Sequence, residues 1–375
     1  MMHSVLEKIA KLRNGAPINI DYDNSNPYRL VVQEDDGSKT AYYFSTPIYN
    51  RKTRKMVDIG FKFNVGVIYK NGTNAKISIT NNIFMENCEG TCRISLPNKC
   101  NYISSQEVQC GNITLFPTVN GVALKCAIEE NKKIDFLVDV EQPFLNVRAN
   151  DRCVALMKEQ FRPLVVFSCI GATDASGNVI APVKMEYQKL TDKKYKITVS
   201  STNPLAHYVL FESNLYENKL FQDTTVESNN PLINNTFGGV GFIGNSSEYG
   251  EQWLYSRPDF DKLSDLDGEK IKKAILHLPK YNNSDIELQC FKVSARFCSF
   301  GSNWSNKISE SGYVSQSVSN NTYHSIDLTG LLTDDFGNLS RSEGLILRTK
   351  TKNRGFIAIA TGDNYYTPQI LEINF

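Results

Sequence analysis

The side chains best suited to chemistry in this sequence are aromatic ones that follow residue 250. The five candidates are Trp253, Tyr255, Trp304, Tyr365 and Tyr366. Trp304 lies in a loop of polar residues that includes two asparagines, Asn303 and Asn306. Sugars present apolar C–H faces and hydroxyl edges, which exposed rings and neighbouring amide or charged side chains recognise. The five aromatic residues are therefore candidates for carbohydrate recognition, and packing within the fold is the alternative, which we favour for Trp304, Tyr365 and Tyr366.

Basic residues follow in a predicted strand of the same region. Alternation places Ile346, Arg348 and Lys350 on one face of that strand, and Leu345, Leu347 and Thr349 on the other. Arg354 comes at the turn that follows. A basic strand face can meet an acidic polysaccharide, and a solvated outer face is the alternative. Arg348, Lys350 and Arg354 therefore join the ligand-binding candidates.

A cluster of acidic residues is a candidate metal site. It contains Asp259, Asp261, Asp265 and Asp267, followed by Gly268 and Glu269. Its spacing differs from that of an EF-hand loop. A structural calcium ion at a loop is one interpretation, and a solvated hairpin is the other. No further cofactor is predicted.

The nine cysteines leave three alternatives open. Four of them fall between residues 88 and 110, without a CxxC pair. Zinc sites usually show tighter pairs, and disulfides need an oxidising compartment. The default expectation is that the cysteines are reduced and act as small apolar residues.

Motifs for catalysis and for nucleic-acid binding are absent from the sequence. The four histidines have no nucleophile motif beside them, and the glycines of residues 238–244 are not followed by Lys-Ser or Lys-Thr. The net charge is +1, so the basic excess typical of a nucleic-acid binder is missing. We predict a protein that is not an enzyme, with a glycan-active enzyme as the least favoured alternative because two carboxylates can meet from anywhere in a chain.

Short alternating segments predict an all-β fold of two antiparallel β-sandwich domains with a short N-terminal helix. Strands recur every 8–15 residues without long helices between them, and turns such as Asp35-Asp36-Gly37 join them. At the start, Ser4 and Glu7 have the spacing of a capping box and Asn14-Gly15 ends the helix. The predicted domains are the helix at 1–16, a β-sandwich at 17–205 and a second domain at 206–375.

The C-terminal part resembles the DNRLRE family, a jelly-roll module similar to carbohydrate-binding modules. The similar segments, in order, are residues 222–231, 235–238, 271–278, 323–329, 343–348 and 363–375. The resemblance covers residues from about 208 to 375, whereas residues 17–205 only loosely resemble the β domain that precedes this module in wall-associated and Rhs-type proteins. The family's naming motif is altered at residues 252–260, where Pro258 predicts an early strand end. The resemblance implies a jelly roll, and in some members polysaccharide binding.

These observations favour a non-enzymatic component of an extracellular or phage-tail-like assembly that presents a jelly roll for surface or glycan attachment. A free carbohydrate-binding protein of the cell surface is the alternative. The first residues lack an apolar stretch of signal-peptide length, so we expect no signal peptide, and no apolar run reaches membrane-spanning length. We therefore expect synthesis in the cytoplasm and exposure on a particle or cell surface. The expected partners are other copies or other subunits of an assembly, with polysaccharide as a further candidate, but neither nucleic acid nor a membrane.

Overall fold

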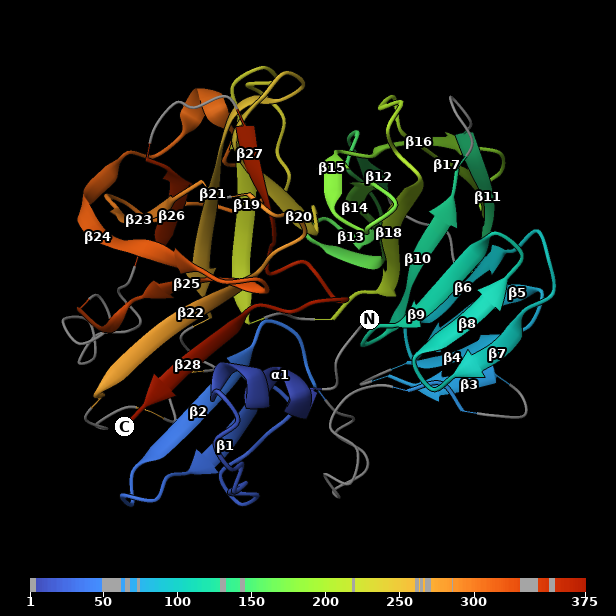
Figure 1. The fold of residues 1–375 in the computed structure, drawn as a ribbon. Helices are drawn as coiled ribbons and strands as arrows, with labels where there is room; N and C mark the ends of the chain where they lie inside the picture. Colours follow the sequence, from blue (N-terminus) through green and yellow to red (C-terminus); the bar gives the residue numbers. More distant parts are fainter. Residues whose placement is uncertain are drawn as a thin grey trace. The chain divides into compact units, whose positions relative to one another are not determined.

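The computed structural model consists almost wholly of antiparallel strands, which confirms the predicted all-β class. Its two compact units comprise residues 1–6 with 47–218, and residues 7–46 with 219–375 (Figure 1). In the described part of the chain, no helix has both the length and the apolar character needed to cross a membrane. The structure describes residues 5–48, 62–64, 68–72, 75–128, 133–141, 146–217, 220–259, 263, 266, 271–284, 286–330, 343–350 and 355–375.

The first unit is a sandwich of two antiparallel sheets. The larger sheet has the order β12 (Asn146–Ala149), β13 (Cys153–Glu159), β14 (Arg162–Thr173), β18 (Tyr208–Leu215), β10 (Gly121–Ala127), β9 (Ile113–Pro117), β8 (Glu107–Cys110) and β7 (Asn101–Ser104), with β15 (Val179–Ala181) on β14. The smaller sheet has the order β16 (Lys184–Lys189), β17 (Lys194–Ser200), β11 (Lys133–Val140), β6 (Gly90–Ser95), β5 (Asn82–Asn87), β4 (Lys76–Ile79) and β3 (Ile68–Asn71).

One apolar core joins the two sheets of the first unit. Alternate residues of β11, such as Phe136 and Val138, are buried in it together with residues of β18 such as Phe211. The rings of Phe136 and Phe211 meet edge to face with centroids 5.3 Å apart. Because these two residues belong to different sheets, their contact ties the layers of the sandwich together.

A disulfide bond joins Cys100, the residue before β7, to Cys110, the last residue of β8. The expectation that all cysteines are reduced is therefore wrong for this pair. The other seven cysteines form no disulfide bond, and of these only Cys88 and Cys298 are exposed. Burial raises the pKa of the Cys290 thiol to about 12, so this cysteine behaves as a small apolar residue, as expected. Among the described residues, no three His, Cys, Asp or Glu side chains gather in a way that could hold a metal ion.

The second unit is built from a continuous chain of paired strands. Their order is β1 (Arg29–Gln33), β2 (Lys39–Phe44), β28 (Ile370–Asn374), β22 (Lys273–Pro279), β25 (Tyr323–Asp327), β24 (Glu310–Ser319), β23 (Leu288–Val293), β26 (Leu345–Thr349), β21 (Gly250–Pro258), β20 (Val240–Ser246) and β27 (Gly355–Ala360), with β19 (Phe221–Glu227) on β21. Strand β24 pairs with β23 through its first part and with β25 through its last three residues. It therefore passes from one layer of the sandwich to the other.

Eight of these strands have the pairing order of a jelly roll. One layer contains β2, β28, β22 and β25, and the other contains β21, β26, β23 and β24. Leu276, Ile326 and Leu371 of the first layer share one core with Leu254 and Leu347 of the second. The predicted jelly roll is thus present, but its first strand is β2, near the beginning of the chain.

The first unit is consequently an insertion between two strands of the second. The chain leaves the second unit after Thr46 and returns at Lys219. At the point of return, the backbone N–H of Leu220 donates to the carbonyl of Ser45, at 3.0 Å. The Ser45 hydroxyl also accepts from the backbone N–H of Gln369, at 2.9 Å. These bonds fix the two crossing points side by side within the jelly roll.

The observed division differs from the expected boundaries after residues 16 and 205. The N-terminal hairpin of β1 and β2 belongs to the second unit because β2 pairs with the last strand, β28. Strand β18 belongs to the first unit because it lies between β10 and β14. Both assignments depend on pairing between segments distant in sequence, which local alternation does not encode.

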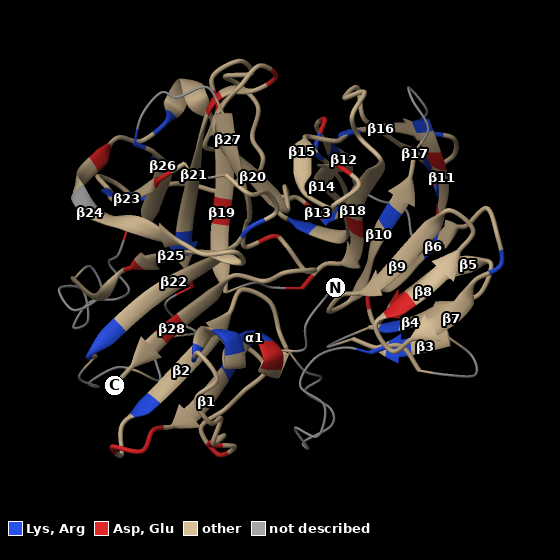
Figure 2. Cartoon of the chain, viewed as in Figure 1, with Lys and Arg blue, Asp and Glu red and all other residues tan. Residues whose placement is uncertain are grey.

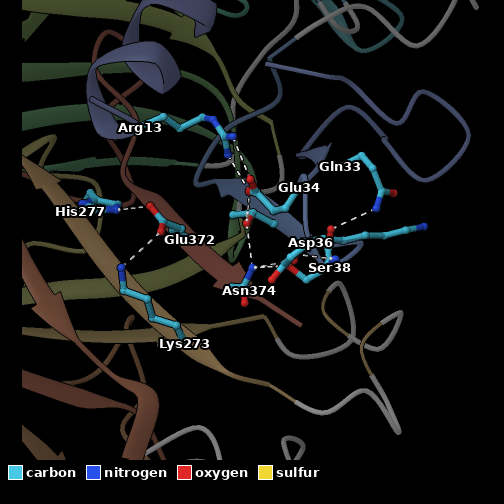
Figure 3. A network of polar contacts seen from close by, with 11 residues as sticks. Arg13, Gln33, Glu34, Asp36, Ser38, Lys273, His277, Glu372 and Asn374 are labelled. Carbon is cyan, nitrogen blue, oxygen red and sulfur yellow. Dashed lines mark hydrogen bonds and ion pairs between the residues drawn. The ribbon is translucent and has the colours of Figure 1, made fainter. Parts of the chain in front are cut away.

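Helix α1 (Val5–Leu12) and a chain of polar contacts cover the outer face of the layer that begins with β1 and β2 (Figure 3). Arg13, just beyond the helix, forms two hydrogen bonds of 2.7 and 2.9 Å with Glu34, and this guanidinium holds the pKa of the Glu34 carboxyl below its usual value. Thr40 donates to Glu34 and in turn accepts from Asn374, at 3.1 Å. Polar bonds therefore also link the N-terminal segment to the C-terminal strand.

Candidate functional site

A second apolar layer covers the face of β21, β23 and β26 that points away from the jelly-roll core. Alternation along β21 places Leu254 in the core and Trp253 and Tyr255 on the opposite face. In β26, Leu345 and Leu347 face the core, whereas Ile346 lies in the outer layer, as the sequence predicts. Phe291 and Val293 of β23 complete the outer layer from the neighbouring strand.

The segment between β23 and β24 folds over this layer. Its short helix η2 (Trp304–Asn306) begins at Asn303, whose side chain accepts from the backbone of Asn306 in a capping box. The Tyr255 hydroxyl donates to the carbonyl of Ile308, at 2.6 Å. Burial, and to a smaller degree the charge of Glu310, raises the pKa of Tyr255, so its hydroxyl stays a proton donor. These bonds fix the backbone on both sides of Trp304.

Two tryptophans and two cations meet where this segment contacts the sheet. The rings of Trp253 and Trp304 lie edge to face, with centroids 5.3 Å apart. Lys307 Nζ is 3.9 Å from the centroid of the Trp304 ring, and the Arg348 guanidinium is 5.3 Å from that of Trp253. Arg348 also covers the Phe291 ring, at 4.4 Å. We call Trp253, Trp304, Lys307 and Arg348 the Trp–cation cluster.

The two cations of the cluster differ in their ionic partners. Arg348 Nη2 forms an ion pair of 2.9 Å with Glu310, and Trp253 Nε1 donates to Glu251, at 2.9 Å. Lys307, by contrast, pairs with no carboxylate among the residues that the structure describes. A cation held against an aromatic face keeps its charge and adds about 0.5–2 kcal/mol of attraction. Lys307 is therefore a positive charge that the described part of the fold leaves uncompensated.

The cluster is accessible enough to meet a ligand. Trp304 and Lys307 are half-buried, and 28% of the Arg348 side chain is exposed. Trp253 is buried beneath them. The arrangement thus offers a fixed indole and two cationic groups at the surface, which suits a ligand with apolar faces and negative charge.

The structure brings together Trp253, Trp304 and Arg348 from the predicted ligand-binding residues, with Tyr255 directly beneath them. Lys307 was not predicted, although its place three residues after Trp304 is a signal that sequence reasoning could have used. Tyr255 is fully buried and holds the covering segment, so its predicted ligand contact is wrong and the packing alternative is correct.

The remaining aromatic candidates belong to a separate turn. Asn364 accepts from the backbone N–H groups of Tyr366 and Thr367, at 3.1 and 2.7 Å, and organises this turn. Tyr365 is buried and Tyr366 is half-buried. Neither tyrosine lies in the outer layer that contains the tryptophans. Packing explains Tyr365, which agrees with the alternative interpretation.

The other predicted basic and acidic residues do not join the cluster. Lys350 follows β26 and forms a solvated pair with Glu287, at 3.5 Å. Arg354 lies outside the described residues, as do Asp261, Asp265 and Asp267. Of the acidic candidates only Asp259 is described, so calcium binding stays a prediction. Figure 2 shows Lys and Arg residues interspersed with Asp and Glu residues along the strands of both units.

A serine, a histidine and a glutamate form a second polar constellation, on the outer face of β25, β22 and β28. His277 Nδ1 lies 2.9 Å from Ser325 Oγ. His277 Nε2 lies 3.1 Å from Glu372 Oε2 (Figure 3). Nucleophilic catalysis would also need hydrogen-bond donors for an oxyanion. All three residues lie within antiparallel ladders whose backbone N–H groups bond to neighbouring strands, and His277 is buried. The constellation is therefore better suited to join three strands than to attack a substrate.

Acid is expected to destabilise the second unit through another histidine, His324. Burial, with a smaller effect of Lys280, lowers the pKa of His324 to about 4. The unfolded chain then binds more protons than the folded chain between about pH 6.5 and pH 4, so the free energy of unfolding falls as the pH is lowered through this window. We expect a loss of about 3 kcal/mol between pH 7 and pH 4, measured by urea unfolding. His324→Gln should flatten this dependence, and an unchanged slope would contradict the assignment.

No family model matches the chain, and no curated protein matches it. The resemblance to the DNRLRE family therefore stays a prediction, and the case for a function rests on the geometry of the Trp–cation cluster.

Proposed function

We propose that the protein is a non-enzymatic binding protein whose jelly-roll unit attaches to an acidic polysaccharide through the Trp–cation cluster. The observation that carries the proposal is the position of Lys307, 3.9 Å above the Trp304 ring and without a carboxylate partner among the described residues. An indole that is already fixed in place loses little conformational freedom on binding. The apolar faces of sugar rings would contact the indole, and their carboxylates would approach Lys307 and Arg348.

The predicted display role rests on the architecture. The first unit is inserted in the sequence of the jelly roll, so the chain passes between the two units twice and not once. Such a scaffold suits a protein that holds a binding surface at a fixed place in a larger body. Assembly with other copies or other subunits, and a position on a particle or cell surface, follow only from the sequence and stay predictions.

Tryptophan emission gives a direct test, because both tryptophans of the chain belong to the cluster. Oligomers of polygalacturonate are expected to change this emission in a saturable way. Their methyl esters, which lack the negative charge, should bind about tenfold more weakly or worse. Trp304→Ala should remove binding in a calorimetric titration, and Lys307→Gln should weaken it by about tenfold.

Lys350→Gln is the matched control, since it removes a lysine of the same region that already pairs with Glu287. Its affinity should equal that of the unaltered protein. Equal affinities for polygalacturonate and its methyl ester would show that the cluster recognises a neutral polysaccharide and not an acidic one. Failure of every acidic and neutral polysaccharide to bind, or full binding by Trp304→Ala, would contradict the proposal.

A further inference from the structure

The first unit contains a buried lysine, asparagine and glutamate that the proposed binding function does not use. They are Lys70 near the end of edge strand β3, Asn120 in the turn between β9 and β10, and Glu217 just after β18. Each is almost fully buried, and the Lys70 residue is only 1% exposed. The burial of charged and polar groups costs free energy unless they have specific partners. The burial of these three side chains in one unit therefore points to a specific role.

Lys70 presents its amine to the turn that carries Asn120. Its Nζ donates to the carbonyl oxygen of Thr118 and lies 3.4 Å from that of Val119, the two residues that precede Asn120. Burial lowers the pKa of Lys70 to about 7. A desolvated lysine of this kind is available as a neutral amine near physiological pH, which is the nucleophilic form.

The Asn120 amide lies against the backbone of Gly72, close to Lys70 in the chain, and is hydrogen-bonded to a carboxyl group. A Cβ atom on Gly72, two residues after Lys70, would clash with Asn120 Oδ1 and with the Val119 carbonyl oxygen. Gly72 therefore lets the Asn120 amide approach the backbone beside Lys70. Asn120 Nδ2 donates to Glu217 Oε2, at 2.9 Å, so the carboxyl group contacts the nitrogen that would leave.

We propose that Lys70 and Asn120 form an intramolecular isopeptide bond, and that Glu217 carries the protons of this reaction. Lys70 Nζ attacks Asn120 Cγ, the Nζ–Cγ bond forms, and the Cγ–Nδ2 bond breaks. Glu217 accepts a proton from Nζ and delivers one to Nδ2, which leaves as ammonia. No atom changes oxidation state, and no other reactant is needed.

The bond would join the edge strand of the smaller sheet to a turn of the larger sheet. Strand β3 is the last strand of the smaller sheet and, among the described strands, pairs on one side only, with β4. The turn that carries Asn120 belongs to the larger sheet, since β9 and β10 flank it. A covalent bond between them would hold the terminal strand in place, where an edge strand is otherwise the easiest to detach.

Intact mass spectrometry of the full-length, disulfide-reduced protein tests the proposal. The folded protein should be lighter than its sequence by one molecule of ammonia, and proteolysis should yield one branched peptide that contains Lys70 and Asn120. Lys70→Arg, Asn120→Ala and Glu217→Gln should each have the full mass of their sequence. Arg cannot replace Lys70 because its guanidinium is not a nucleophile. Gln keeps a hydrogen-bonding group at position 217 but cannot accept and deliver a proton as a carboxyl group does.

A second reaction would give the same loss of mass, because Asn120 precedes Gly121 and can close on its own backbone to a succinimide. The succinimide product would give no branched peptide, and the loss of ammonia would persist in Lys70→Arg. Either of these two results would overturn the proposal. A full mass for the unaltered protein overturns it equally. The unaltered protein decides the question even if a variant fails to fold. Lys125→Arg changes a lysine of β10 that lies over the Tyr208 ring, and it should keep the loss of ammonia.

Discussion

Replacement of Tyr43 with alanine is expected to lower the free energy of unfolding of the second unit by about 3–5 kcal/mol. Tyr43 lies in β2, is almost fully buried, and packs in the jelly-roll core with residues such as Leu371. Its removal leaves a cavity next to the pairing between β2 and β28. Both tryptophans lie in the second unit, so urea unfolding followed by tryptophan emission reports this unit alone.

Tyr22→Ala is the matched control, because Tyr22 belongs to the same N-terminal segment and is 59% exposed. It should change the midpoint of unfolding very little. If the N-terminal segment were part of the inserted domain, Tyr43→Ala would leave the tryptophan transition unmoved. That outcome would contradict the assignment of β2 as the first strand of the jelly roll.

Phe211→Ala should have the opposite selectivity and destabilise the first unit by about 3–5 kcal/mol. Phe211 is buried between β10 and β14 and meets Phe136 of the opposite sheet. The variant should lose β structure at lower urea concentration in far-ultraviolet circular dichroism. The transition seen by tryptophan emission should stay where it is, because no tryptophan lies in this unit.

The control for this change is Phe161→Ala, at a ring that is 55% exposed in the turn between β13 and β14. It should leave both transitions in place. A shift of the tryptophan transition in Phe211→Ala, with the first unit unaffected, would contradict the assignment of β18 to the first unit.

Local features of the fold could be predicted because they depend on neighbouring residues. Asp36-Gly37 marks the turn between β1 and β2, where Gly37 has a φ of +85° and Ser38 bonds back to Asp36. Pro258 is the last residue of β21, as its missing N–H predicts. The two faces of β26 follow from simple alternation.

The pairing of distant strands could not be predicted in the same way. Nothing in residues 39–44 indicates that their partner is the last strand, because any strand of suitable length and alternation presents the same backbone groups. The same limit applies to the candidate site. The sequence identified Trp253 and Trp304 separately, and only the fold of the covering segment shows that their rings meet.

Side chains with several plausible roles also required the structure. Tyr255 was predicted to contact a ligand, yet it is buried and donates to the Ile308 carbonyl. His277 lies on the strand face opposite Leu276 and Leu278, in agreement with simple alternation along β22. Its partners Ser325 and Glu372 come from two other strands, so their identity depended on pairing that the sequence does not reveal.

The indole N–H signals in a nuclear magnetic resonance spectrum test the central claim most directly. The chain has two tryptophans and therefore two such signals, and Trp304→Phe assigns them by removing one. With polygalacturonate oligomers, both signals should shift and reach saturation at the same ligand concentration. If the oligomers bind while both indole signals stay in place, or if no acidic polysaccharide moves either signal, the Trp–cation cluster is not the binding surface.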